Sequence, residues 1–368
     1  MILSIPVDFQ REGGKRGIMQ NIKLAIPNEI IFVDRVKQGA DRSLPRQKEN
    51  DMNKKIDNRK VAIVGCGFVG SSAAFALMQS GLFSEIALVD VDRERAEGEA
   101  LDISHGVPFV GHVEVYAADY DEIMDAAIVV ITAGAAQKPG ETRLDLVNKN
   151  IKIFQSILPE FKKRSYPGIL LIVSNPVDIL TLAALELSGL PEHRVIGSGT
   201  VLDTARLKMR LSDHLDVDSR SVHSFIIGEH GDSEIAAWSS TNISGIPLND
   251  FCEMRGFFSH EESMKQIADE VRNSGYEIIE KKHATYYGIA MSVVRICKAI
   301  VMNERSILSV STKMNGEYGI SDICLSMPVI VGEEGVGDHI PLPLSVEEHQ
   351  LLLTSANALK EVARSAGL

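Results

Sequence analysis

Short apolar runs alternate with amphipathic segments between residues 60 and 190. Apolar runs of four to six residues favour strands of a parallel sheet that is covered on both faces. The expected strands are Val61–Val64, Glu85–Val89, Val113–Tyr116, Ala127–Ile131 and Ile169–Val173. Helical spacing separates them at Phe68–Gln79, Arg93–Ile103, Ile151–Lys163 and Val177–Ser188. This alternation predicts an α/β domain with a doubly wound parallel sheet, which we place at residues 58–197.

The pattern changes after about Gly197, and residues 198–368 are expected to form a second, α+β domain. Helices are predicted at Val201–Leu215, Glu261–Lys281, Thr285–Met302 and Val346–Ser365. Alternating polar and apolar residues predict strands at Ser221–Ile227, Ile307–Thr312 and Ile323–Val331. We expect the apolar helix 285–302 to pack back onto the first domain.

The first 51 residues lack a sustained period of either 2 or 3.6. They carry nine Lys and Arg against seven Asp and Glu. One interpretation is a disordered extension or an arm that packs on another subunit. The other interpretation, which we favour, is that the start codon has been assigned too far upstream and that Met52 is the true first residue. Lys48-Glu49 can be encoded AAGGAG, a purine-rich ribosome-binding sequence, just before that methionine.

Composition and charge exclude several classes of protein. The net charge of −12, without a basic stripe, argues against nucleic acid or an anionic membrane as a partner. No apolar run reaches the roughly 18 residues that a membrane span needs, and no signal peptide is evident. The four cysteines, none with zinc-site spacing, indicate reduced thiols, no metal and a cytoplasmic location. They are Cys66, Cys252, Cys297 and Cys324.

A GxGxxG motif at residues 65–70 joins the first expected strand to its helix. Gly65 allows the tight turn, Gly67 lets the backbone approach a pyrophosphate, and Gly70 lets the helix pack closely. Asp90 ends the next strand, 20 residues beyond the last glycine, where a carboxylate can bind ribose hydroxyls and repel a 2′-phosphate. This context predicts a Rossmann-type site for NAD, although Arg93 and Arg95 lie close to Asp90.

Candidate acid–base groups lie in the second domain. Asp203 and Arg206 are three residues apart on one expected helix, so their side chains project from the same face. A local salt bridge is the simpler interpretation of that pair. His230 follows an apolar strand and has an acid on one side and a glycine on the other, which favours a catalytic role.

Two loops at the ends of expected strands add further polar groups. Residues 134–143 have glycine near both ends and carry Gln137 and Arg143, as a hinged lid would. Asn175 ends the fourth apolar strand, where an open α/β sheet binds its ligands. The simpler interpretation of residues 134–143 is an exposed connector, and that of the segment around Asn175 is the start of a helix.

The ordered combination of these segments resembles the lactate/malate dehydrogenase family from about Lys60 to the C-terminus. The matching segments are the glycine motif, Leu-Val-Asp90, Thr132-Ala-Gly134, the lid, Ser174-Asn-Pro, Leu202-Asp203-x-x-Arg206, Gly228-Glu-His230-Gly and Thr285-Tyr-Tyr-Gly. The resemblance implies an oxidoreductase that moves a hydride between NAD(H) and a small 2-hydroxy or 2-keto acid.

The resemblance also implies a role for each site residue. Arg206 would hold the substrate carboxylate, and protonated His230 would donate to the keto oxygen with Asp203 stabilising the imidazolium. Arg143 would arrive with the lid and polarise the carbonyl, while Asn175 would orient substrate and nicotinamide. The remaining cofactor contacts would come from the glycine motif, with Phe68 and Val69, and from Thr132, Gly134, Ser198 and Ile289.

Substrate choice depends mainly on Gln137. In this family an arginine six residues before the lid arginine selects a dicarboxylate, and a glutamine cannot neutralise a second buried charge. Gln137 and the small neutral Thr285 therefore favour pyruvate and L-lactate. The alternatives are a malate or branched 2-hydroxy-acid dehydrogenase of the same fold, and a non-catalytic NAD-binding protein.

Within the family the lid and residues 284–291 are most like bacterial L-lactate dehydrogenases. That likeness implies a homotetramer in glycolysis or fermentation, with fructose 1,6-bisphosphate as an allosteric activator at a subunit interface. His223 matches the histidine of that activator site. Lys208 stands where an arginine is expected, and lysine binds phosphate without the bidentate fork.

Overall fold

The computed structural model describes residues 56–135, 140, 142–258 and 260–368. The predictions for residues 1–51 and for Gln137 lie outside these residues. Within the described part, no helix is both long and apolar enough to cross a membrane.

A nine-stranded mixed sheet runs through the described part of the chain, in the order β14-β13-β12-β6-β5-β4-β1-β2-β3. Its six parallel strands are β1 (Asp57–Val64), β2 (Glu85–Val89), β3 (Glu114–Ala117), β4 (Ala126–Ile131), β5 (Ile169–Ile172) and β6 (Val195–Gly197). Three antiparallel strands extend it: β12 (Ser306–Asn315), β13 (Ser321–Gly332) and β14 (Gly335–His339). The predicted parallel α/β sheet is confirmed.

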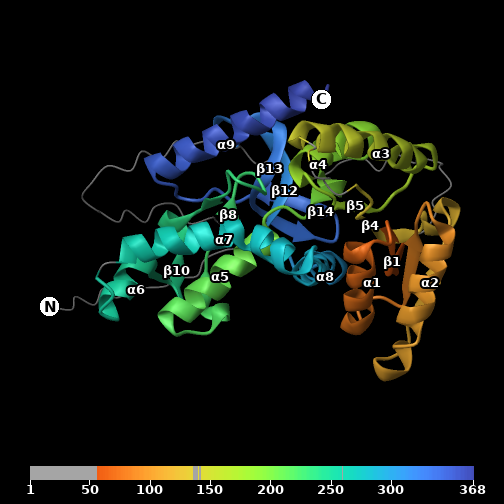
Figure 1. Cartoon of the computed structure of the whole chain (residues 1–368), viewed down its shortest axis with the longest axis horizontal. Helices are drawn as coiled ribbons and strands as arrows, with labels where there is room; N and C mark the ends of the chain where they lie inside the picture. Colours follow the sequence, from red (N-terminus) through yellow and green to blue (C-terminus); the bar gives the residue numbers. More distant parts are fainter. Residues whose placement is uncertain (1–55, 136–139, 141, 259) are drawn as a thin grey trace, which may run out of the picture. The chain divides into compact units, whose positions relative to one another are not determined.

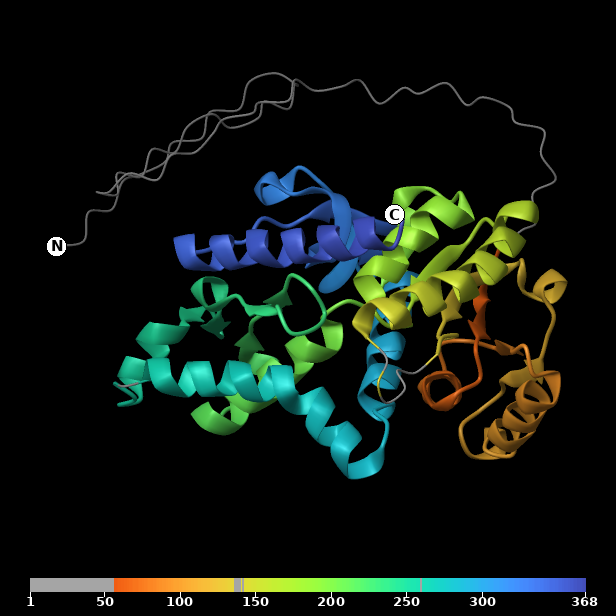
Figure 2. The same ribbon diagram turned by 45° about the horizontal axis from the view of Figure 1, so that its top comes forward.

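Helices cover both faces of this sheet (Figures 1 and 2). One core joins it to α3 (Arg143–Lys163), α4 (Val177–Ser188) and α9 (Val346–Ser365). The other joins it to α1 (Phe68–Ser80), α2 (Arg93–Ser104) and α8 (Tyr287–Val301). Strands such as β4 are buried along their whole length, which explains their uninterrupted apolar sequence.

A third core lies among the helices of the second half. It joins α5 (Val201–Leu215), α6 (Leu248–Met254) and α7 (His260–Lys282) to the short strands β7 (Val222–His223), β8 (Ile226–Ile227), β9 (Ile235–Ala236) and β10 (Asn242–Ile243). The strand β11 (Ile246–Pro247) pairs with β10. Leu207, Leu211 and Leu215 form the apolar stripe of α5 at helical spacing.

Three expectations from the pattern differ from the structure. Helix α3 begins at Arg143 rather than Ile151, because Thr142 and Asp145 form a capping box that starts the helix two turns earlier. The expected strand 221–227 is two short strands, β7 and β8, in different sheets. The strands expected in the second domain at 307–312 and 323–331 join the main sheet, where Ser311 pairs with Gly197.

Candidate active site

The glycine motif forms a tight turn between β1 and α1. Gly65 has φ +104°, and a Cβ there would lie 2.5 Å from the backbone nitrogen of Ala133. A Cβ on Gly70 would lie 1.9 Å from the carbonyl oxygen of Gly65. A Cβ on Gly67 would meet no atom within 4 Å, so open space lies beside the N-terminus of α1. Helix N–H groups and that space suit a pyrophosphate.

Asp90 lies at the end of β2, beside this turn. Its Oδ2 accepts a hydrogen bond from the backbone N–H of Cys66 at 2.5 Å, and its Oδ1 accepts from that of Asp92 at 3.0 Å. The hydroxyl of Thr132 donates to the carbonyl of Gly65 at 2.7 Å and so braces the turn from β4. Arg93 forms ion pairs with Glu97 and Asp119, both acids of the same domain.

A cavity of about 480 Å³ lies at the carboxyl ends of the parallel strands. Eight of the predicted site residues line it: Val69, Asn175, Ser198, Asp203, Arg206, His230, Thr285 and Ile289. They come from five segments that are far apart in sequence. Phe68 lies at the edge of α1, two-thirds exposed, and its ring stacks on that of Tyr286 with centroids 5.5 Å apart.

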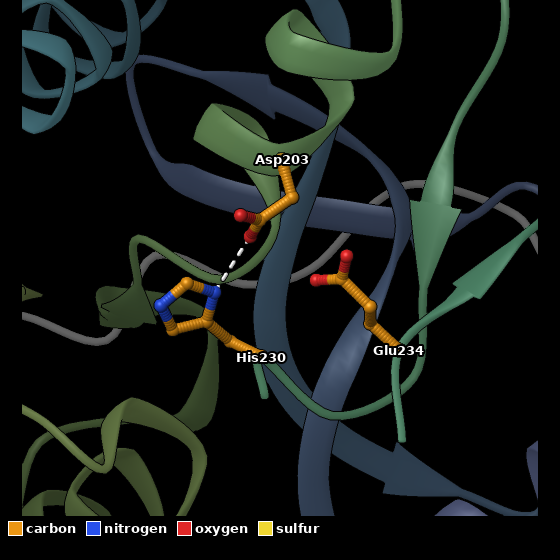
Figure 3. Close-up of side chains that lie close together, drawn as sticks. All are labelled: Asp203, His230 and Glu234. Atoms are coloured by element: carbon orange, nitrogen blue, oxygen red, sulfur yellow. Dashed lines mark hydrogen bonds and ion pairs between the residues drawn. The ribbon is translucent and has the colours of Figure 1, made fainter. Parts of the chain in front are cut away.

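Asp203 binds both His230 and Arg206 in this cavity. Its Oδ2 lies 2.6 Å from Nδ1 of His230, and its Oδ1 accepts from Nη1 of Arg206 at 2.8 Å. The Asp203 side chain is 2% exposed and that of His230 is 25% exposed. Figure 3 shows the hydrogen bond between them as a dashed line. The simple helix salt bridge therefore exists, and the same aspartate also holds the histidine.

The charges in the cavity shift the pKa values of both partners. Burial acts to lower the pKa of His230, but the Asp203 carboxylate outweighs it and raises that pKa to about 9. Burial acts to raise the pKa of Asp203, and the neighbouring His230 and Arg206 outweigh it, so the pKa is lowered. The pair thus holds a proton on the imidazole at neutral pH, as a general acid requires.

The buried side chain of Asn150 holds the main chain at the start of the expected lid segment. The side-chain oxygen of the buried Asn150 accepts from the backbone N–H of Ala135 at 2.7 Å, directly after Gly134. Its amide nitrogen donates to the carbonyl of Asn175 at 2.7 Å. Arg143 is the first residue of α3, but its side chain lies outside the described part, as does the whole of Gln137.

The two expected activator residues lie on neighbouring elements of the third core. Lys208 is half-buried on α5, where burial lowers its pKa and the nearby positive charge of Arg295 lowers it further. His223 is exposed on β7. The positive charges of Lys208 and Arg295 act on one another, and Lys208 is partly desolvated, which suits an anionic ligand.

The sequence interpretation missed four charged residues at this site: Asp178, Asp232, Glu234 and Arg272. Glu234 is 6% exposed, its Oε1 is buried without a hydrogen-bond partner, and burial raises its pKa. Figure 3 shows its carboxylate directed toward Asp203. Arg272 lines the same cavity from α7, and Asp178 binds the main chain of His230. The position of Glu234, four residues after His230, was a sequence signal that could have indicated its place in the site. No comparable sequence signal indicated Arg272.

Donor atoms of Asp203, His230 and Glu234 all lie within 4.8 Å of one another, a spacing that a metal ion could also use. Asp203, however, already binds the Arg206 guanidinium, whose positive charge disfavours a cation at this point. The cluster is therefore better suited to proton transfer than to metal binding.

Family models match most of the chain. The model for "lactate/malate dehydrogenase, NAD binding domain" matches residues 59–197. The model for "lactate/malate dehydrogenase, alpha/beta C-terminal domain" matches residues 200–366.

Individual relatives match over nearly their whole length. An L-lactate dehydrogenase of Acetivibrio thermocellus is 51% identical over 314 residues, which cover 85% of this chain and 99% of the relative. L-lactate dehydrogenase 1 of Clostridium acetobutylicum is 54% identical over 304 residues, covering 83% and 97%. The crystal structure of a minor L-lactate dehydrogenase from Enterococcus mundtii has a TM-score of 0.81 at 47% identity, covering 83% of this chain and 98% of that one.

Proposed function

Because the chain belongs to the lactate/malate dehydrogenase family, we propose that it is an NAD-dependent L-lactate dehydrogenase, which interconverts pyruvate and L-lactate. The observation that carries this proposal is the joint placement of Asp203, Arg206 and His230 in one cavity beside the dinucleotide turn. A protein that only bound a dinucleotide would not need this acid–base pair.

His230 is the general acid of pyruvate reduction and the general base of lactate oxidation. Asp203 accepts from Nδ1, which leaves Nε2 as the ring nitrogen that exchanges the proton with the substrate oxygen. The buried carboxylate also stabilises the imidazolium, so the proton is available at neutral pH. The partial exposure of the ring toward the cavity allows substrate to reach it.

Arg206 binds the substrate carboxylate. A guanidinium has five N–H donors in a planar fork, so its single bond to Asp203 leaves donors for a second carboxylate. Because Asp203 holds both Arg206 and His230, the substrate carboxylate and the proton donor are kept at a fixed separation. Asn175, whose main-chain carbonyl accepts a hydrogen bond from Asn150, also lines the cavity and orients the substrate.

The bound NADH supplies the hydride, and the chain's own residues hold the cofactor. Its phosphates fit beside Gly67 at the N-terminus of α1, with Phe68, Val69, Thr132 and Gly134 around the turn. Asp90 accepts from ribose hydroxyls, and Arg93 is occupied by Glu97 and Asp119 rather than free for a 2′-phosphate. Ser198 and Ile289 line the cavity and would hold the nicotinamide.

Pyruvate is preferred over oxaloacetate because Gln137 places no positive charge in the lid. The role that the family resemblance gives to Arg143 is to polarise the keto group of the bound substrate. Thr285 keeps the substrate pocket small and neutral. A second substrate carboxylate would be desolvated without a partner, at a cost of several kcal/mol.

The test is NADH oxidation followed at 340 nm with pyruvate and oxaloacetate in parallel. The proposal requires faster turnover of pyruvate at equal concentration. Faster turnover of oxaloacetate would overturn the substrate assignment, and no oxidation with either acid, by a folded protein that binds NADH, would overturn the function.

We further propose a homotetramer that fructose 1,6-bisphosphate activates through Lys208 and His223. Helix α5 carries Lys208 two residues after Arg206, so a ligand that moves this helix through Lys208 can shift the substrate-binding arginine. Large apolar side chains are exposed on α2, α5 and α8, which suits burial against another copy: Leu101, Met209 and Met291. We place the enzyme in the cytoplasm, in keeping with its four free cysteines.

A further inference from the structure

Asp178 is a buried acid to which the roles described above assign nothing. It lies in the first turn of α4 and is 1% exposed. Its Oδ2 accepts from the backbone N–H of His230 at 2.8 Å, and its Oδ1 accepts from the hydroxyl of Ser311 at 2.6 Å. Burying a carboxylate is costly unless hydrogen bonds and a favourable field compensate it. The two donors and the N-terminus of α4 supply that compensation.

The carboxylate connects three segments that meet at the cavity. Asn175 precedes Asp178 by three residues, at the end of β5, and lines the cavity. His230 lies on the loop after β8, and Ser311 lies in β12, where it pairs with Gly197 of β6. Ser311 is fully buried in the main sheet, so it is a rigid support. Asp178 therefore fixes the proton donor relative to the substrate-orienting amide.

The negative charge of Asp178 also acts on the imidazole. The charged groups that face His230 are Asp203 and Arg206 from α5, Asp178 from α4, Arg272 from α7, and Asp232 and Glu234 from its own loop. Among the acids, Asp203 has the largest effect in raising the pKa of His230, and Asp178 ranks next, ahead of Glu234. Because burial raises the pKa of Glu234, that side chain is less able to supply a full charge.

We propose that Asp178 is a positioning residue for His230, which holds the main chain of the acid and adds a second buried negative charge that stabilises the imidazolium. Asp203 orients the ring through Nδ1, while Asp178 fixes the backbone from which the ring projects. This inference rests on the proposed function, since it concerns the same proton transfer.

The decisive variant is Asp178→Asn, because it removes the charge and can keep both hydrogen bonds. The amide oxygen can accept from the N–H of His230, and the amide nitrogen can donate to the hydroxyl of Ser311. The measurement is kcat/KM against pH in both directions, with the Tm and the NADH Kd determined alongside. Glu186→Gln is the matched control, because Glu186 is an exposed acid on the same helix.

Loss of the charge lowers the pKa of His230, so both pH profiles shift to lower pH, by about 0.5 or more. Pyruvate reduction loses activity on its alkaline side, whereas lactate oxidation gains activity near pH 8. A merely structural role would lower both rates and leave the pH midpoints unchanged. Unshifted midpoints in a folded Asp178→Asn variant with normal NADH binding would therefore overturn the inference. An inactive wild-type protein would instead overturn the proposed function.

Should Asp178→Asn fail to fold, Ser311→Ala tests the anchoring separately. This change keeps the charge and the bond to His230 but removes the support in β12. The expected result is a several-fold lower kcat with an unchanged NADH Kd, because a loosened carboxylate no longer fixes the acid. Wild-type kcat in a folded Ser311→Ala variant would contradict the anchoring.

Discussion

The ring Nδ1 of His230 lies 2.6 Å from Oδ2 of Asp203, while the other oxygen of the same carboxylate binds Arg206. One buried side chain thus fixes the position of the proton donor and that of the group that binds the substrate carboxylate. Both neighbours carry positive charge, and together they stabilise the negative charge of Asp203. This shared carboxylate leads to the first two predictions.

Replacing Asp203 by Asn removes the charge that stabilises the imidazolium and allows the wrong ring tautomer. We expect kcat/KM for pyruvate to fall by roughly 10²-fold or more, in steady-state assays of NADH oxidation. The control is Asp213→Asn, because Asp213 is an exposed acid on the same helix. Equal effects of the two changes would contradict the role of Asp203.

The pH dependence should differ in sign between the two directions. His230 must be protonated to reduce pyruvate, so kcat/KM for pyruvate is high below pH 9 and falls tenfold per pH unit above it. Lactate oxidation needs the neutral ring and rises through the same range. The measurement is kcat/KM from pH 6 to 10 in both directions. A pyruvate profile with its midpoint near 6.5 would mean that Asp203 does not stabilise the protonated form of His230.

Gln137→Arg should reverse the substrate preference. A positive charge at this position pairs with the second carboxylate of oxaloacetate and leaves pyruvate without that interaction. We expect the ratio of kcat/KM for oxaloacetate to that for pyruvate to rise by at least about 10²-fold. Gln137→Leu, which has no charge, serves as the control, and an equal change of ratio in that variant would show that charge is not the cause.

Two glycine substitutions should separate folding from cofactor binding. In Gly70→Ala the added methyl meets the carbonyl of Gly65, so we expect a loss of about 1–3 kcal/mol in the free energy of unfolding. In Gly67→Ala the methyl enters open space, so the Tm should stay the same while the NADH Kd rises. Thermal unfolding and NADH fluorescence titration measure the two effects. Normal NADH affinity in Gly67→Ala would place the phosphates elsewhere.

Fructose 1,6-bisphosphate should lower the KM for pyruvate, and Lys208→Ala should abolish that response. Lys208→Arg should strengthen it, because the guanidinium binds phosphate bidentately. The assay is pyruvate saturation with and without the sugar bisphosphate, with inorganic phosphate as the control anion. An unchanged KM in the wild-type protein would remove the proposed activator site.

Local sequence patterns were sufficient for much of the fold and for the dinucleotide site. Helices α4, α5 and α9 begin and end where the pattern placed them, because spacing and caps act within a few residues. The glycine motif with Asp90 is equally local, since its parts follow one strand, one turn and the next strand.

Contacts between distant segments could be decided only by the tertiary structure. The pattern predicted β12 and β13 as strands, but only the structure shows that they extend the main sheet, because β12 pairs with β6 more than 100 residues away. Asp178 lies within the predicted helix Val177–Ser188, where nothing in the sequence connects it with His230, yet it binds the main chain of that residue, 52 positions further along. The spacing of Asp203 and Arg206 predicted only a salt bridge, and the contact of Asp203 with His230 was implied by the family resemblance and not by the local pattern. The residue types determined which chemistry was available, and packing decided which of those groups meet.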